Sequence, residues 1–77
     1  MEPKRVKLTN LEMKELFKET YLIWDMYKDL TLTDEVWTKL INLCCLLNEK
    51  YHMCLMAVNM TNEIIEQLDL RNRPCRI

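Results

Sequence analysis

Apolar side chains recur at helical spacing through the middle of the chain. Between Thr33 and Tyr51 they fall three or four positions apart, which places them on one side of an α-helix. The positions that share this side are Trp37, Leu40, Ile41, Cys44, Leu47 and Tyr51. Thr33 stands where an N-cap is expected, and Thr31 offers a second candidate cap two residues earlier. Asp34 and Glu35 follow on the first turn, where the helix dipole favours negative charge. The pattern predicts a helix over residues 34–50.

Two further helices are predicted on either side of this one. Thr9 and Glu12 match a capping box, so the first helix is expected over residues 10–28. Its apolar stripe consists of Met13, Leu16, Phe17, Thr20, Ile23, Trp24 and Tyr27. The last helix is expected over residues 53–70. Its stripe consists of Cys54, Ala57, Val58, Thr61, Ile64, Ile65 and Leu68. Residues 1–8 then form a flexible or loosely docked arm, and residues 71–77 form a tail in which Pro74 prevents further helix.

Two all-α architectures fit this pattern. The apolar positions from Leu40 to Leu68 step by four and three without a slip, which is typical of one unbroken helix with a coiled-coil seam. A helical hairpin with one long helix over residues 34–69 would close its core only as an obligate dimer. The other architecture is a three-helix bundle. We favour the bundle, because helices in globular proteins are usually short and because Asn48 and His52 are poor helix formers.

Composition supports a single small helical domain over residues 1–77. The chain has no glycine and only two prolines among its 77 residues, whereas an all-β fold needs glycine-bearing turns. Apolar residues make up 49% of the chain, which argues against disorder. A chain of this length buries only about 60–65% of its unfolded surface, so its margin of stability is thin.

Charge is unevenly distributed along the chain. Residues 9–69 carry eleven acidic and five basic side chains, whereas both ends are basic. Flexible basic arms can contact phosphates, so nucleic-acid binding is an alternative hypothesis. The residues that would carry it are Lys4, Arg5, Lys7, Arg71, Arg73 and Arg76. Against it, the body is acidic and no helix carries a basic stripe.

The four cysteines favour packing over chemistry. Cys44 and Cys45 are neighbours on a helix and point about 100° apart, so they do not readily bond each other or converge on one metal ion. The single histidine, His52, lies two positions from Cys54, and such residues do not face each other on a helix. We therefore expect no catalytic residue, no metal site and no cofactor. With no signal peptide and no membrane-length apolar run, we expect a reduced, cytoplasmic protein.

Several large apolar residues lie off the stripes that would form the core. The candidate interface residues are Tyr21, Leu22, Met26, Leu43, Leu46, Leu55, Met56 and Met60. A single 77-residue bundle would leave several of them exposed as a patch, and aromatic and methionine residues are enriched at interface cores. The sequence thus predicts a homodimer, a surface that docks on another protein, or both, with no small-molecule substrate and no membrane.

A set of short motifs adds a resemblance. The motifs are Tyr27 followed by Asp34-x-x-Trp37-x-x-Leu40, then Glu49-Lys50-Tyr51, and a final amphipathic helix with Ile64-Ile65-Glu66. Over residues 16–70 the chain resembles a loose set of small helical proteins carried by mobile elements and prophages of Gram-positive bacteria. In that set Asn or Gly often follows the last tyrosine, whereas His52 and Met53 follow it here. The pattern of that set has a short turn at this point, and the departure at His52 and Met53 leaves the break between the last two helices open. By analogy of context it implies a regulator or inhibitor that blocks a host or rival protein, as anti-CRISPR proteins do.

Overall fold

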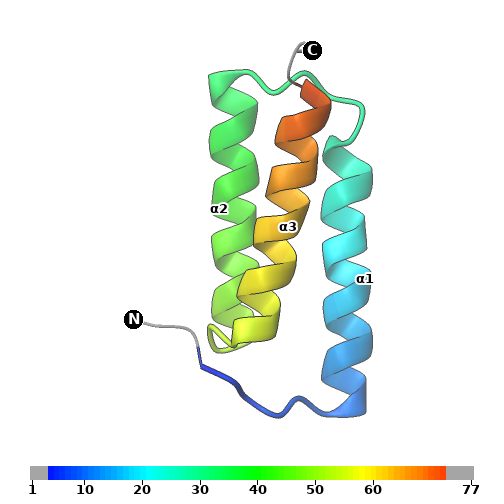
Figure 1. The fold of residues 1–77 in the computed structure, drawn as a ribbon, viewed down its shortest axis with the longest axis vertical. Coiled ribbons are helices and arrows are strands. Elements are labelled where there is room, and N and C mark those ends of the chain that lie inside the picture. Colours follow the sequence, from blue (N-terminus) through cyan, green and yellow to red (C-terminus); the bar gives the residue numbers. More distant parts are fainter. Residues whose placement is uncertain (1–3, 73–77) are drawn as a thin grey trace.

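Within residues 4–72, three helices alternate in direction and form a bundle. The computed structural model describes residues 4–72, in which α1 (Asn10–Tyr27), α2 (Asp34–Lys50) and α3 (Leu55–Asn72) run up, down and up (Figure 1). Every pair of helices is in contact, although α1 and α2 each pack more closely against α3 than against one another. The predicted three-helix bundle is confirmed. The single long helix over residues 34–69 is wrong, because a turn separates α2 from α3.

The predicted caps start the first two helices. The Thr9 hydroxyl accepts the Glu12 backbone N–H at 3.1 Å, and the Glu12 carboxylate accepts the Thr9 backbone N–H at 2.9 Å. At the start of α2, the Thr33 hydroxyl accepts the Val36 backbone N–H at 3.3 Å. These bonds satisfy backbone donors that have no partner within the helix.

The turn between α2 and α3 uses two left-handed residues. His52 and Met53 have φ angles of 58° and 54°, a region that residues other than glycine seldom occupy. The Met53 N–H donates to the Asn48 carbonyl at 2.7 Å and closes the end of α2. As a result α3 starts at Leu55, two residues later than the sequence pattern predicts.

Glycine at His52 is expected to stabilise the fold. A left-handed conformation costs an ordinary residue about 1–2 kcal/mol, and glycine avoids this cost. Glycine also loses more backbone entropy on folding, which cancels part of the gain. His52→Gly should therefore raise the free energy of unfolding by about 0.5–1 kcal/mol. His52→Val should lower it, because a β-branched side chain fits this region worst. Urea unfolding measures both. As a control, Glu66→Gly on an exposed part of α3 should lower the free energy of unfolding by about 0.5–1 kcal/mol. If both glycine variants lost stability equally, His52 would not be left-handed.

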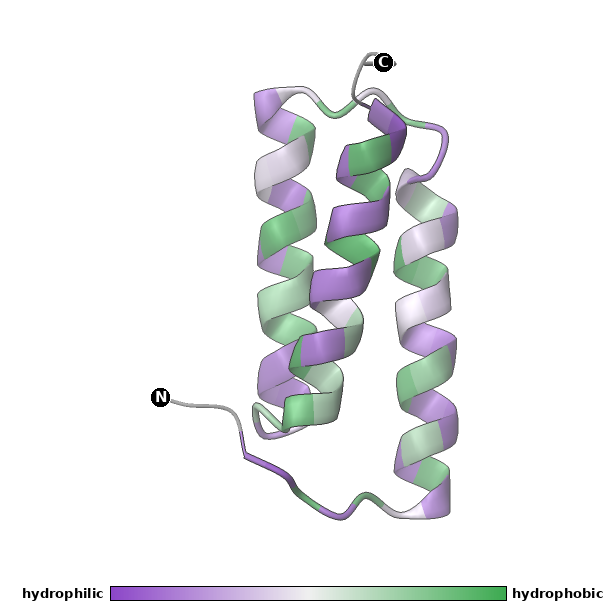
Figure 2. Ribbon diagram, in the orientation of Figure 1, coloured by the Kyte–Doolittle hydropathy of each residue, from purple (hydrophilic) through white to green (hydrophobic). Residues whose placement is uncertain are grey.

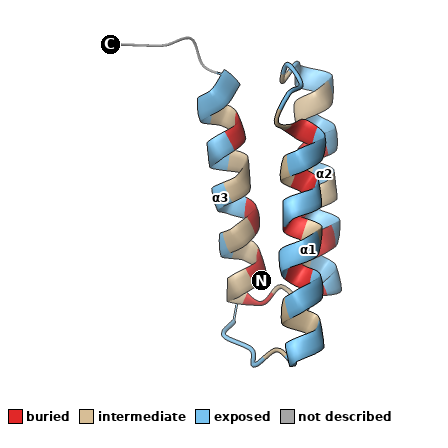
Figure 3. Ribbon diagram, turned by 90° about the vertical axis from the view of Figure 1, so that its right-hand side faces the viewer, coloured by how far each residue is buried: buried red, intermediate tan, exposed pale blue. Residues whose placement is uncertain are grey.

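The buried residues line the inner side of each helix (Figure 3). Leu16, Leu40 and Leu68 have no exposed surface, and each comes from a different helix. The remaining members of the apolar core are Ile23, Tyr27, Cys44, Leu47, Tyr51, Cys54 and Ala57. One predicted core residue is misplaced, because the Phe17 side chain is 53% exposed. The buried residues of α1 therefore cover a narrower part of the helix surface than its apolar residues do.

Contacts at the two ends of the bundle tie the chain together. The arm crosses the lower end in Figure 1, and there the Lys4 carbonyl accepts the Leu55 N–H at 2.7 Å. The arm thereby supplies a cap to α3. At the opposite end, the Asn72 side-chain oxygen accepts the Leu32 N–H of the α1–α2 loop at 2.9 Å. No helix within residues 4–72 has the length and apolar character needed to cross a bilayer.

Candidate functional site

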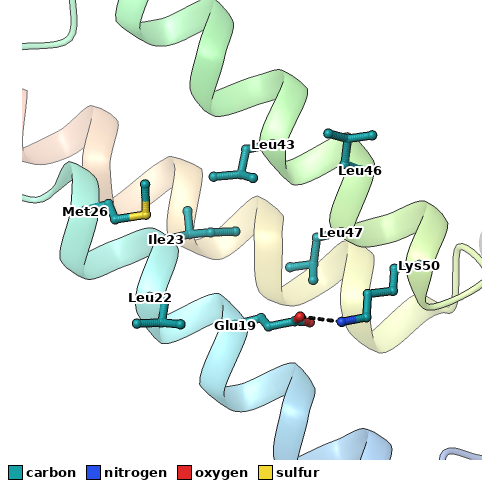
Figure 4. Close-up of a pocket in the computed structure, with 8 residues that line it drawn as sticks. All are labelled: Glu19, Leu22, Ile23, Met26, Leu43, Leu46, Leu47 and Lys50. Carbon is teal, nitrogen blue, oxygen red and sulfur yellow. Dashed lines mark hydrogen bonds and ion pairs between the residues drawn. The ribbon is translucent and has the colours of Figure 1, made fainter.

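An apolar groove runs between α1 and α2 on the side away from α3 (Figure 4). Ile23 of α1 and Leu47 of α2 are buried at its floor. The groove has a volume of about 270 Å³. Figure 2 shows hydrophobic positions recurring along both helices. Because α1 and α2 pack less closely against each other than against α3, the groove stays open to solvent.

Four of the eight predicted interface residues meet in this groove. Leu22 and Met26 project from α1 and are 45% and 58% exposed. Leu46 projects from α2 and is 63% exposed, and Leu43 is half-buried beside it. Exposed aliphatic side chains that line one concavity are the usual mark of a binding surface, whereas single exposed leucines are ordinary.

A polar lip closes one end of the groove. The Glu19 carboxylate forms an ion pair with the Lys50 ammonium and accepts the Tyr51 hydroxyl at 2.8 Å. Partial burial opposes ionisation of Glu19, but the hydrogen bonds from Lys50 and Tyr51 outweigh it and lower its pKa. The same contact raises the pKa of Lys50. Burial and the carboxylate of Glu19 both raise the pKa of Tyr51, so its hydroxyl stays protonated at neutral pH. Sequence reasoning missed this lip, because Lys50 and Glu19 are 31 positions apart.

The lip predicts a pH dependence of stability. Because the folded state lowers the pKa of Glu19, its contribution is complete above the ordinary glutamate pKa of about 4.3 and is lost as pH falls through the folded-state pKa. Glu19→Gln should therefore lower the free energy of unfolding at pH 7 by up to about 1 kcal/mol, with solvent screening limiting the effect.

Urea unfolding at pH 7 and at stepwise lower pH measures this effect. The difference between the wild type and Glu19→Gln should shrink as the solution becomes acidic. The exposed Glu66→Gln serves as the control and should change little at either pH. A gap between the wild type and Glu19→Gln that widened in acid would contradict the assignment.

The other four predicted interface residues lie elsewhere. Tyr21 is 61% exposed on the opposite flank of α1, in a shallow depression that Phe17 and Trp24 also line. Leu55, Met56 and Met60 are half-buried on α3, in a depression that also includes residues of the N-terminal arm. The predicted set is therefore divided among three places, and only the groove collects four of its members.

The candidate nucleic-acid residues do not converge. Lys4, Arg5 and Lys7 are exposed on the arm at one end of the bundle, and Arg71 lies at the other. Arg71 is also engaged within the chain, since its guanidinium lies 5.1 Å from the centre of the Trp24 ring and its Nε donates to the Lys28 carbonyl at 3.4 Å. The two remaining candidates, Arg73 and Arg76, fall outside the described residues.

The cysteines separate by burial as their spacing predicts. Cys44 and Cys54 are buried and Cys45 is exposed, and all three are free thiols. Burial raises the pKa of Cys44 to about 11, so its thiol stays protonated at neutral pH. Cys75 falls outside the described residues. Within residues 4–72, no group of three or more His, Cys, Asp or Glu side chains is arranged to hold a metal ion.

Comparison of the chain with protein-family models, with curated proteins and with solved structures found no match.

Proposed function

We propose that this chain is a non-enzymatic protein-protein interaction module that binds a helical protein surface in the groove between α1 and α2. The observation that carries the proposal is the convergence of Leu22, Met26, Leu43 and Leu46 from two helices on one open apolar concavity. An amphipathic helix of a partner fits such a groove, because its apolar residues lie on one face and that face can be buried in the groove.

The chemical character of the groove lining supports a binding function without catalysis. Its lining is apolar apart from Glu19 and Lys50, and these two side chains neutralise each other. The Tyr51 hydroxyl is committed to Glu19 as a donor. No nucleophile and base are paired among the residues that line the groove, so the groove lacks the arrangement that nucleophilic catalysis requires.

The resemblance to proteins of mobile elements and prophages extends the proposal. On that analogy the module acts stoichiometrically, as a regulator or inhibitor that occupies a surface of a host or rival protein. The free thiols of the cysteines within residues 4–72 fit a reducing cytoplasm. The alternative, nucleic-acid binding through the basic ends, has less support, because the described basic residues lie at opposite ends of the bundle.

A display library of amphipathic helices tests the proposed function. Selection against the wild-type chain at low micromolar concentration should enrich helices that bind it, and Leu46→Lys should abolish their binding. Leu70→Lys is the matched control, because Leu70 is 51% exposed on α3 outside the groove. Selection of no helix, or of helices that bind wild type and Leu46→Lys equally, would overturn the proposal.

A further inference from the structure

The groove is bordered by two ridges whose side chains match in order. Along α1, the ridge reads Glu19, Leu22, Met26 and continues to Asp29 just beyond the helix. Along α2, followed in the opposite direction, the ridge reads Lys50, Leu46, Leu43, Lys39. Each ridge therefore has two apolar side chains between two charges, and the charges are acidic on α1 and basic on α2.

The two ridges are also level with each other along the bundle. The ion pair between Glu19 and Lys50 fixes the level at one end. Since α1 and α2 run in opposite directions with the same rise per residue, Leu22 is level with Leu46, and Asp29 is level with Lys39. A rotation about an axis parallel to the helices leaves the height of each residue along the bundle unchanged. Residues that are level within one chain are therefore also level between two chains related by such a rotation.

We infer that the groove is covered by a second copy of this chain, an inference that rests on the proposed function and names its partner. A two-fold axis parallel to the helices lays α1 of one copy over α2 of the other, and the paired helices run antiparallel. Leu22 and Met26 then pack against Leu46 and Leu43 of the second copy. Glu19 meets Lys50 of the second copy at one end, and Asp29 meets Lys39 of the second copy at the other. The helices α1 and α2 of the two copies then form a four-helix bundle, in which both apolar ridges of each copy are covered.

Charge selects this pairing over the other two-fold arrangement. An axis perpendicular to the helices would lay α1 over α1 and α2 over α2, which sets acidic ridge against acidic ridge. Glu12 and Glu15 add negative charge at the α1 side of the groove, because the charges of both raise the pKa of Tyr51, which lies beside Glu19. Neighbouring charges of opposite sign are present: Lys18 lies beside Glu19, Glu35 is paired to Lys39 at 3.7 Å, and Arg71 of α3 lies 4.0 Å from Asp29. These pairs are exposed, and they leave the order along the two ridges unchanged.

Sedimentation equilibrium from micromolar to millimolar concentration tests the inference. The wild type should form a dimer, and Leu46→Glu and Leu22→Lys should each weaken dimerisation by about tenfold or more, because each places a charge in the apolar contact. Leu70→Lys should dimerise like the wild type. Circular dichroism and cooperative unfolding show that each variant is folded, as expected for substitutions at exposed positions.

Mixing the two variants identifies the pairing. In the proposed arrangement each dimer has two contacts between position 22 of one chain and position 46 of the other. In a mixed dimer of Leu46→Glu and Leu22→Lys, one contact pairs the new glutamate with the new lysine, and the other keeps Leu22 against Leu46. The mixture should therefore dimerise more strongly than either variant alone. In the α1-over-α1 arrangement the new charges do not meet, and mixing restores nothing.

The outcomes separate this inference from the proposed function. A chain that is monomeric at millimolar concentration, a dimer that tolerates Leu46→Glu, or a mixture without rescue would each overturn the inference. A monomeric chain that still binds selected helices through Leu46 would leave the proposed function standing. A dimer restored by mixing, with no helix selected from the library, would show that the groove serves only self-association.

Discussion

Replacing Leu40 with alanine is expected to lower the free energy of unfolding by about 2–5 kcal/mol. The Leu40 side chain has no exposed surface and packs in the core shared by all three helices. Its truncation removes buried apolar surface and leaves a cavity that the surrounding helices refill only in part. In a chain of 77 residues a loss of this size removes a large part of the stability, so thermal unfolding should move sharply to lower temperature.

Leu46→Ala provides the matched control on the same helix. The Leu46 side chain is 63% exposed, so the same truncation should change the free energy of unfolding by no more than about 0.5 kcal/mol. Urea unfolding of both variants, at a concentration where the chain is monomeric, measures the contrast. Similar losses at the two positions would mean that Leu46 is covered in the folded monomer, and the groove would then not be open.

The contrast between these leucines shows where sequence reasoning succeeds. Leu40 lies within the predicted apolar stripe of α2, and Leu46 lies outside it. The helical spacing of the apolar residues is therefore enough to tell the buried leucine from the exposed one. The cap at Thr9 was predictable, because a capping box depends on residues within three positions of each other. For α2 the sequence offered both Thr31 and Thr33, and the structure uses Thr33. The bundle was favoured because helices in globular proteins are usually short and because Asn48 and His52 are poor helix formers, whereas the unbroken apolar phase favoured one long helix.

The break between α2 and α3 could not be placed from the pattern. Tyr51 and Cys54 both point into the core, so the apolar phase continues across the turn as if the helix did. Glycine usually marks a left-handed turn, but here His52 and Met53 adopt it. The turn is fixed by tertiary packing, since a continuous helix would carry the residues of α3 away from α1.

The groove depends on how closely two helices approach. The pattern shows that Leu22 and Leu46 lie off their stripes, but only the packing of α1 against α2 brings them to one concavity. Tyr21 is adjacent to Leu22 in sequence and lies on the other flank of α1. Phe17 was predicted to be buried and is exposed, because α3 covers a narrower arc of α1 than its apolar residues occupy.

Replacing Tyr51 with alanine is expected to be about as damaging as the loss of Leu40, at about 3–5 kcal/mol. The Tyr51 side chain is 3% exposed and belongs to the apolar core at the end of α2. Its ring therefore contributes buried area, and its hydroxyl contributes the hydrogen bond to Glu19 of α1. Alanine removes both contributions.

Tyr51→Phe separates the ring from the hydroxyl. Phenylalanine keeps the buried ring and removes the donor to Glu19, whose side chain is 31% exposed and can bind water instead. We therefore expect a loss of only about 1 kcal/mol, and a Glu19 pKa closer to its ordinary value, since one of the hydrogen bonds that lower it is gone. Urea unfolding gives the stabilities of both variants, and NMR titration of the Glu19 carboxyl gives its pKa. If Tyr51→Phe cost as much as Tyr51→Ala, the hydroxyl, and not the ring, would hold the lower end of the groove together.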